Sequence, residues 1–106
     1  MNTDRIRQLE KFIEDDPNDP FPKYALALEH LQENKEKSAQ LFEELLKNHS
    51  KYIGTYYHAA ALYSELGDRK RAEQIYLAGI EIATELNEAH ALKELRSAYM
   101  NFQFEE

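Results

Sequence analysis

The chain has no cysteine, and it has only three glycines and three prolines among its 106 residues. The absence of cysteine excludes disulfides, thiolate catalysis and cysteine-based zinc sites. The scarcity of glycine and proline favours long, uninterrupted helices, because a β-rich fold of this length needs many more turn residues. No apolar run approaches the roughly 18 residues that can cross a membrane. We therefore expect a small all-α protein without a membrane segment.

The charge of the chain is strongly one-sided. It carries 13 Lys and Arg against 20 Asp and Glu, a net charge of −7. Nucleic acids and anionic membrane surfaces are bound by clusters of basic residues, and here the basic residues are scattered among acids. We therefore predict no nucleic acid and no membrane among its partners. Residues 1–5 carry charge where a signal peptide needs an apolar stretch, so we expect a cytoplasmic protein.

The apolar residues repeat with the period of an α-helix in six segments. In the first segment Ile6, Leu9, Phe12 and Ile13 predict one buried face. We expect Thr3 or Asp4 to cap this helix, and the prolines at positions 17 and 20 to end it and to begin the next.

Short polar connections separate the remaining helices. The second helix is expected to extend to about residue 33, with Asn34 as a left-handed stop. The third ends at residues 48–50, the fourth spans about 52–66, and the fifth ends near residues 86–87. Gly67 and Asp68 form a stop-and-cap pair between the fourth and fifth helices. Connections of two to five residues predict antiparallel neighbours.

The sequence also repeats itself at a fixed interval. Phe42 and Tyr76 are 34 residues apart, as are Leu28 and Leu62. This interval is the period of a helix–turn–helix repeat.

Residues 53–86 resemble the tetratricopeptide repeat family in detail. The family's signature of small and aromatic residues is met at the right spacings by Tyr56, Ala59, Ala60, Tyr63, Ala72 and Tyr76. Thr84 stands where proline is usual. Ala60 and Ala72 are expected where the paired helices cross closely, and Gly79 is expected to permit a close helix contact.

A weaker copy precedes this repeat in residues 20–50. Its signature positions are Lys23, Leu26, Ala27, His30, Ser38 and Phe42. The gap from His30 to Ser38 is one residue shorter than the gap from Tyr63 to Ala72. Residues 1–16 resemble an orphan second half-repeat, and residues 88–104 resemble a capping helix. The resemblance thus implies a single domain over residues 1–106, folded as a short right-handed solenoid of about six helices.

No constellation of residues indicates an enzyme. The acidic stretch at residues 15–19 lacks the glycine and the bidentate glutamate of a calcium loop. His30, His49, His58 and His90 include no pair at helical metal-binding spacing. We therefore predict no catalytic residue, no metal and no cofactor.

The resemblance implies that a partner polypeptide binds the inner stripe formed by the first helix of each pair. Carried over by position, this stripe consists of Phe21, Tyr24, Leu28, Leu31, Tyr57, Ala61 and Ser64. Tyr57 points away from the core positions Tyr56 and Tyr63, and exposed aromatic residues often anchor interfaces. The stripe lacks the Lys, Arg and Asn with which some members hold a terminal carboxylate, so an apolar or amphipathic segment is expected. Alternatively, the last helix covers the stripe and leaves no groove.

The C-terminal segment suggests a second surface. It carries Tyr99, Met100, Phe102 and Phe104, too many apolar residues for a freely frayed tail. These side chains either pack back on the fifth helix or form a contact between two copies. Self-association as a homodimer is therefore the alternative function.

Overall fold

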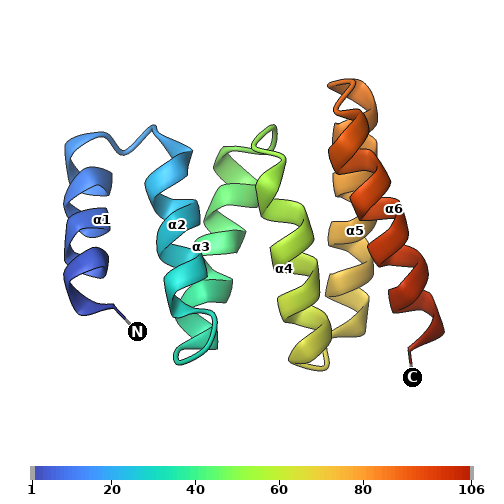
Figure 1. The fold of residues 1–106 in the computed structure, drawn as a ribbon, viewed down its shortest axis with the longest axis horizontal. Helices are drawn as coiled ribbons and strands as arrows, with labels where there is room; N and C mark the ends of the chain where they lie inside the picture. Colours follow the sequence, from blue (N-terminus) through green and yellow to red (C-terminus); the bar gives the residue numbers. More distant parts are fainter. Residues whose placement is uncertain (1, 106) are drawn as a thin grey trace. The chain divides into compact units, whose positions relative to one another are not determined.

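The structure is a computed structural model that describes residues 2–105 of the chain. Its helices are α1 (Thr3–Asp15), α2 (Pro20–His30), α3 (Lys35–Asn48), α4 (Gly54–Glu65), α5 (Arg69–Glu85) and α6 (Ala89–Phe104), as Figure 1 shows. Residues 2–105 contain no strand, so the predicted all-α class with six helices is confirmed. The helices form two compact units, one with α1 to α3 ending at Tyr52 and the other with α4 to α6 beginning at Ile53. Within the described range, no helix combines the length and the apolar character needed to cross a membrane.

Asparagine and aspartate side chains cap the helices of the first unit. The side chain of Asn2 accepts a hydrogen bond from the backbone N–H of Arg5 at 3.0 Å. The prediction that Thr3 or Asp4 caps α1 is therefore wrong, and both residues lie within the first turn. Asp19 caps α2 by accepting from the N–H of Phe21 at 3.1 Å, and Pro20 fits the first helical position because its missing N–H needs no partner.

The connection between α2 and α3 differs from the expected one. Asn34 has a φ of −143°, so it is not the left-handed stop that the sequence suggested. Its side chain instead accepts a hydrogen bond from the N–H of Lys37 at 3.2 Å and so caps the start of α3. Helix α2 already ends at His30, whose carbonyl accepts from the N–H of Asn34 at 2.9 Å. This early end accounts for the shortened gap between the two halves of the first repeat.

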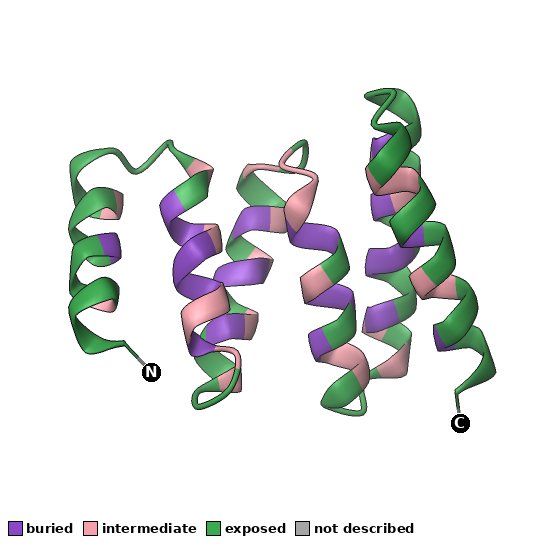
Figure 2. Cartoon of the chain, in the orientation of Figure 1, coloured by how far each residue is buried: buried purple, intermediate pink, exposed green. Residues whose placement is uncertain are grey.

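Helix α1 buries less than its apolar pattern predicts. It packs against α2, and Leu9 is only 4% exposed. Phe12, which the pattern placed on the same face, is 56% exposed, and that prediction is wrong. A helix that packs along one side buries only a narrow strip, and most of α1 is exposed (Figure 2). The exposure of Phe12 places it outside this strip.

The signature positions of the first repeat form the core between α2 and α3. All of them are buried: Lys23, Leu26, Ala27, His30, Ser38 and Phe42. The hydroxyl of Ser38 donates a hydrogen bond to the carbonyl oxygen of Ala27 at 2.7 Å, which joins the two helices inside this core. Lys23 buries its aliphatic stem, and its ammonium group donates to the carbonyl oxygen of Pro17 at 3.0 Å.

In the second unit, α4 and α5 are each followed by a residue in the left-handed backbone conformation. Gly67 has a φ of +85°, and Asp68 then caps α5 by accepting from the N–H of Arg71 at 3.1 Å, as predicted. Asn87 has a φ of +56° and ends α5 in the same way. An asparagine tolerates this conformation better than most residues that carry a Cβ atom.

Small residues let the helices of the second unit approach closely. Ala59, Ala60 and Ala72 are fully buried, as the repeat signature predicts. A Cβ atom added at Gly79 would lie only 2.6 Å from Cβ of Tyr56 and 3.2 Å from Cδ1 of Leu95. The glycine therefore brings α5 against both α4 and α6, and the predicted close contact is confirmed.

Helix α6 closes the second unit by packing on α5 and α4. The ring of Phe102 is 4% exposed and lies 5.4 Å from the ring of Tyr76. The guanidinium of Arg69 lies over the Phe102 ring, with its Cζ 4.1 Å from the ring centre. It also donates a hydrogen bond to the carbonyl oxygen of Phe102 at 2.8 Å. These contacts hold the last turn of α6 on α5.

Candidate functional site

Three of the predicted binding residues lie together on the exposed face of α2. Phe21, Tyr24 and Leu28 are spaced by three and four residues, so they share one side of the helix. The Phe21 side chain is 53% exposed, and Tyr24 and Leu28 are half-buried. The opposite side of α2 forms the core of the first unit, so these three residues are available at the surface.

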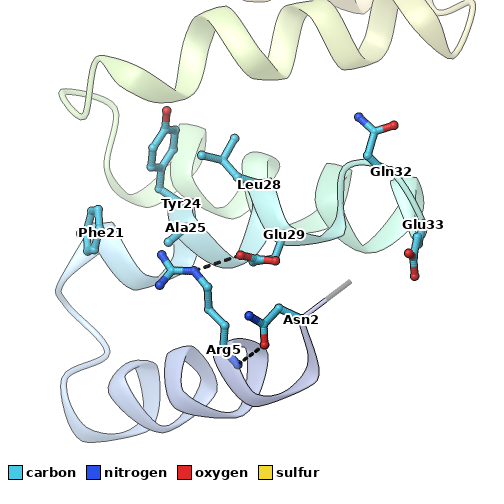
Figure 3. Close-up of a pocket in the computed structure, with 9 residues that line it drawn as sticks. All are labelled: Asn2, Arg5, Phe21, Tyr24, Ala25, Leu28, Glu29, Gln32 and Glu33. Atoms are coloured by element: carbon cyan, nitrogen blue, oxygen red, sulfur yellow. Dashed lines mark hydrogen bonds and ion pairs between the residues drawn. The ribbon is translucent and has the colours of Figure 1, made fainter.

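These residues form part of a groove of about 460 Å³ between α1 and α2. Figure 3 shows its lining, which consists of Asn2, Arg5, Phe21, Tyr24, Ala25, Leu28, Glu29, Gln32 and Glu33. One end of the groove is aromatic and aliphatic, whereas the other carries amide and carboxylate groups. Such a mixture of an apolar surface with a few polar groups is typical of binding grooves for peptides and small ligands.

An ion pair crosses this groove from α1 to α2. The Nε atom of Arg5 lies 2.9 Å from Oε1 of Glu29 (Figure 3). The side chain of Arg5 is 48% exposed, whereas that of Glu29 is 23% exposed. The carboxylate is therefore the more desolvated of the two charges, and a partially desolvated charge interacts more strongly with a ligand.

Tyr24 is positioned by a second aromatic residue of the same unit. Its ring centre lies 5.4 Å from that of Tyr52, at an interplanar angle of 57°. Burial raises the pKa of Tyr24, and the nearby Tyr52 raises it further. The neutral phenol therefore presents an amphipathic aromatic surface at the groove.

The groove differs from the predicted stripe in two respects. Leu31, which caps the C-terminal end of α2, is not among the described residues that line the groove. Conversely, the stripe did not include Asn2, Arg5 and Glu29. Antiparallel packing of α1 on α2 could have indicated them, because it places the start of α1 beside the end of α2.

The remaining predicted residues lie on α4 in the second unit. Tyr57 is 44% exposed, Ala61 is exposed and Ser64 is half-buried. The Tyr57 ring lies edge-on to His58, with the ring centres 5.4 Å apart. Tyr57 therefore projects from the core face, as its place in the sequence predicts. Whether it forms one binding surface with the groove of α1 and α2 stays a prediction.

Helix α6 shields His58 but leaves Tyr57 accessible. Burial lowers the pKa of the His58 imidazole, and the carboxylate of Glu94 on α6 partly opposes this shift. Glu94 also lies 3.3 Å from Nε2 of His90, one turn earlier on the same helix. Within the second unit, α6 thus packs against α4 without closing over Tyr57.

The four aromatic and apolar residues of the C-terminal segment divide into two pairs. Tyr99 and Phe102 pack back on α5, and the Tyr99 hydroxyl donates a hydrogen bond to Oε2 of Glu73 at 3.1 Å. Phe102 is buried within its own chain and is not accessible to a second copy. Met100 and Phe104 are 58% and 82% exposed, so they alone retain the character of a contact surface.

Residues 2–105 show no group of three or more His, Asp or Glu side chains that could hold a metal ion. His30 is buried, and its Nδ1 atom has no hydrogen-bond partner within the described structure.

Comparisons with solved structures identify close relatives. The chain is similar to a crystal structure of a tetratricopeptide repeat domain protein from Salinibacter ruber. The two share 42% identity with a TM-score of 0.78, over 83% of this chain and 99% of that one. A solution NMR structure of a tetratricopeptide repeat domain protein from the same organism shares 42% identity with a TM-score of 0.81, over 86% and 93%. No protein-family model matches the chain, and neither does a curated protein.

Proposed function

Because the chain belongs to the tetratricopeptide repeat family, a family of protein-interaction modules, we propose that it binds another polypeptide through the groove between α1 and α2. Tyr24 and Leu28 act as anchors in this proposal, and Phe21 and Leu31 flank them. Binding involves no catalytic step and no cofactor.

The accessible aromatic surface on α2 is the observation that carries this proposal. Phe21 keeps 53% of its surface exposed although it lies on a packed helix, and it lines a groove with Tyr24 and Leu28. Exposed aromatic side chains that line a groove supply the large, rigid contact area typical of interface anchors. Tyr57, flanked by Ala61 and Ser64 on α4, provides a further anchor in the second unit.

A capture experiment with matched variants tests the proposal. The wild type, Phe21→Ala and Phe12→Ala are immobilised, and the retained proteins of the source organism's lysate are identified. Phe12 is a suitable control because it is a phenylalanine of similar exposure, 56%, on α1 and outside the groove lining. We expect a partner that Phe12→Ala retains and Phe21→Ala loses.

Equal loss in both variants, or retention in both, would show that the groove is not the binding site. The variant Tyr57→Ala tests the anchor on α4 separately. It should weaken capture while helicity and melting temperature stay near the wild-type values, because Tyr57 lies off the core face.

Self-association is the second candidate function. The observation that favours it is the exposure of Met100 and Phe104, which lie one helical turn apart on α6. Two copies would then meet through this end of the chain. The test is the mass in solution of the Met100→Ser/Phe104→Ser variant.

A further inference from the structure

The charges of the groove and of the first unit indicate which kind of polypeptide the groove accepts. We propose that its partner is a segment in which a lysine or arginine adjoins an aliphatic or aromatic residue. This inference rests on the proposed function and specifies its ligand.

The groove carries more negative than positive charge. Its lining contains one cation, Arg5, and two carboxylates, Glu29 and Glu33. The surrounding unit, up to Tyr52, has eight Lys and Arg against eleven Asp and Glu, and the whole chain has a net charge of −7. A basic segment is therefore attracted from a distance, and an acidic one is repelled.

The positions of the charges within the groove point the same way. The side chain of Glu29 is 23% exposed, whereas that of Arg5 is 48% exposed, so the charge of Arg5 is better screened by water. A partner carboxylate approaching Arg5 would come close to Glu29, which already occupies the Nε atom at 2.9 Å. A partner cation approaching Glu29 is opposed in part by the charge of Arg5, but a carboxylate has two acceptor oxygens and can accept from both cations.

The aromatic side chains of the groove also favour a partner segment with a cationic side chain. Phe21 and Tyr24 line the groove with Glu29 on the same helix (Figure 3). Lysine and arginine bind the faces of aromatic rings, and a neighbouring carboxylate adds a hydrogen-bonded ion pair. The adjoining apolar residue of the partner would contact Leu28, so one short segment can satisfy both ends of the groove.

Two charge-removing variants give opposite expected results. In Arg5→Gln the carboxylate of Glu29 loses its pair and becomes available, so a basic peptide should bind about two- to fivefold more tightly. In Glu29→Gln the anion is lost, and the same peptide should bind about two- to fivefold more weakly. Arg7→Gln is the matched control, because it removes the same charge from α1 at an exposed position outside the groove lining.

The probe is a random peptide display library selected on the full-length protein, with Phe21→Ala used for counter-selection. Fluorescence anisotropy with the recovered peptides then gives Kd for each variant at low and at high salt. We expect the recovered peptides to combine a basic with an apolar residue, to weaken at high salt, and to respond in opposite directions to Arg5→Gln and Glu29→Gln.

Other outcomes would separate a failure of this inference from a failure of the proposed function. Recovery of acidic peptides that Arg5→Gln weakens would overturn this inference and leave the proposed function intact, as would neutral peptides that ignore both charge variants. If no recovered peptide depends on Phe21, the groove does not bind polypeptides. The proposed function then fails together with the inference.

Discussion

At the scale of single residues, the close helix contacts of the second unit depend on the absence of a side chain at Gly79. A Cβ atom there would lie 2.9 Å from Cγ of Tyr56 and 2.6 Å from its Cβ, and side-chain rotation does not move the Cβ atom of Tyr56. We expect Gly79→Ala to lower the free energy of unfolding by about 1–3 kcal/mol, the usual cost of an overpacked core. Urea denaturation followed by circular dichroism measures this change.

The sign of the change in unfolding free energy separates the cost of overpacking from the gain in helix propensity. Alanine is a better helix former than glycine by about 1 kcal/mol, so Gly79→Ala would stabilise the chain if no contact opposed it. The exposed neighbour Ala78 provides the control. Ala78→Gly should cost about 0.5–1 kcal/mol from propensity alone. A stabilised Gly79→Ala variant would contradict the close approach of α4 and α5 at this residue.

His58 gives the second unit a dependence on pH. Its pKa is lowered in the folded protein, chiefly by burial, and the carboxylate of Glu94 on α6 partly opposes this shift. As the pH falls through the ordinary histidine pKa of about 6.5, the unfolded chain takes up the proton before the folded one does. The stability that His58 contributes is therefore present at neutral pH and is lost on acidification.

Melting temperatures at a series of pH values test this expectation. The decrease between about pH 7 and pH 5.5 should be smaller in His58→Gln than in the wild type, because the group that titrates in this window is missing. His90→Gln is the control, because it removes an exposed histidine that also lies beside Glu94. Its melting temperature should follow the pH more nearly as in the wild type. An identical slope in wild type and His58→Gln would show that other groups cause the acid sensitivity.

At the scale of elements, two asparagines at helix ends have opposite roles. Asn34 caps the start of α3 with its side chain at a φ of −143°, whereas Asn87 ends α5 at a φ of +56°. Glycine lacks a capping side chain but adopts positive φ at no steric cost. We expect Asn34→Gly to destabilise the protein by a few tenths of a kcal/mol and Asn34→Ala by about 1 kcal/mol. Asn87→Gly should leave stability unchanged or raise it.

Thermal unfolding of the three variants provides the comparison. Asn34→Gly and Asn87→Gly are controls for each other, because they make the same change at two helix ends of opposite geometry. A stabilising Asn34→Gly would mean that this residue takes the left-handed conformation after all.

These helix ends show which local features the sequence predicts. The pair Gly67 and Asp68 was unambiguous, because glycine favours the left-handed position and aspartate favours the cap that follows. Asparagine favours both positions, so the residue type at position 34 could not decide between them. The decision depends on where α2 ends, and packing of α2 on α3 determines that.

Packing also limits which buried and binding residues the sequence can predict. The repeat signature placed His30 at a packing position, and the structure buries it. The signature also included Lys23, which the structure buries as well, although its residue type does not predict this. Phe12 was assigned to the wrong environment, since the apolar pattern does not show how wide a strip of α1 packs on α2. Arg5 was missed for a related reason. Its role depends on an ion pair with Glu29, 24 positions along the chain, which only the packing of α1 on α2 creates.

At the scale of the whole molecule, the open question is whether one chain or two form the functional unit. The exposed surface at the C-terminal end is small, because Phe102 is buried against α5 and only Met100 and Phe104 remain exposed. A stable interface buries about 800 Å² on each partner, far more than two side chains supply. The acidic net charge also opposes the approach of two copies.

We therefore expect sedimentation equilibrium to give the mass of a single chain, 12.5 kDa. If the wild type has twice this mass, Met100→Ser/Phe104→Ser decides which surface is responsible. These substitutions leave the Phe102 contact with Arg69 in place, so they remove exposed apolar area without releasing α6 from α5. A return to the single-chain mass would assign the contact to the end of α6 and favour self-association as the function. A dimer that persists would exclude that end and direct attention to the groove between α1 and α2.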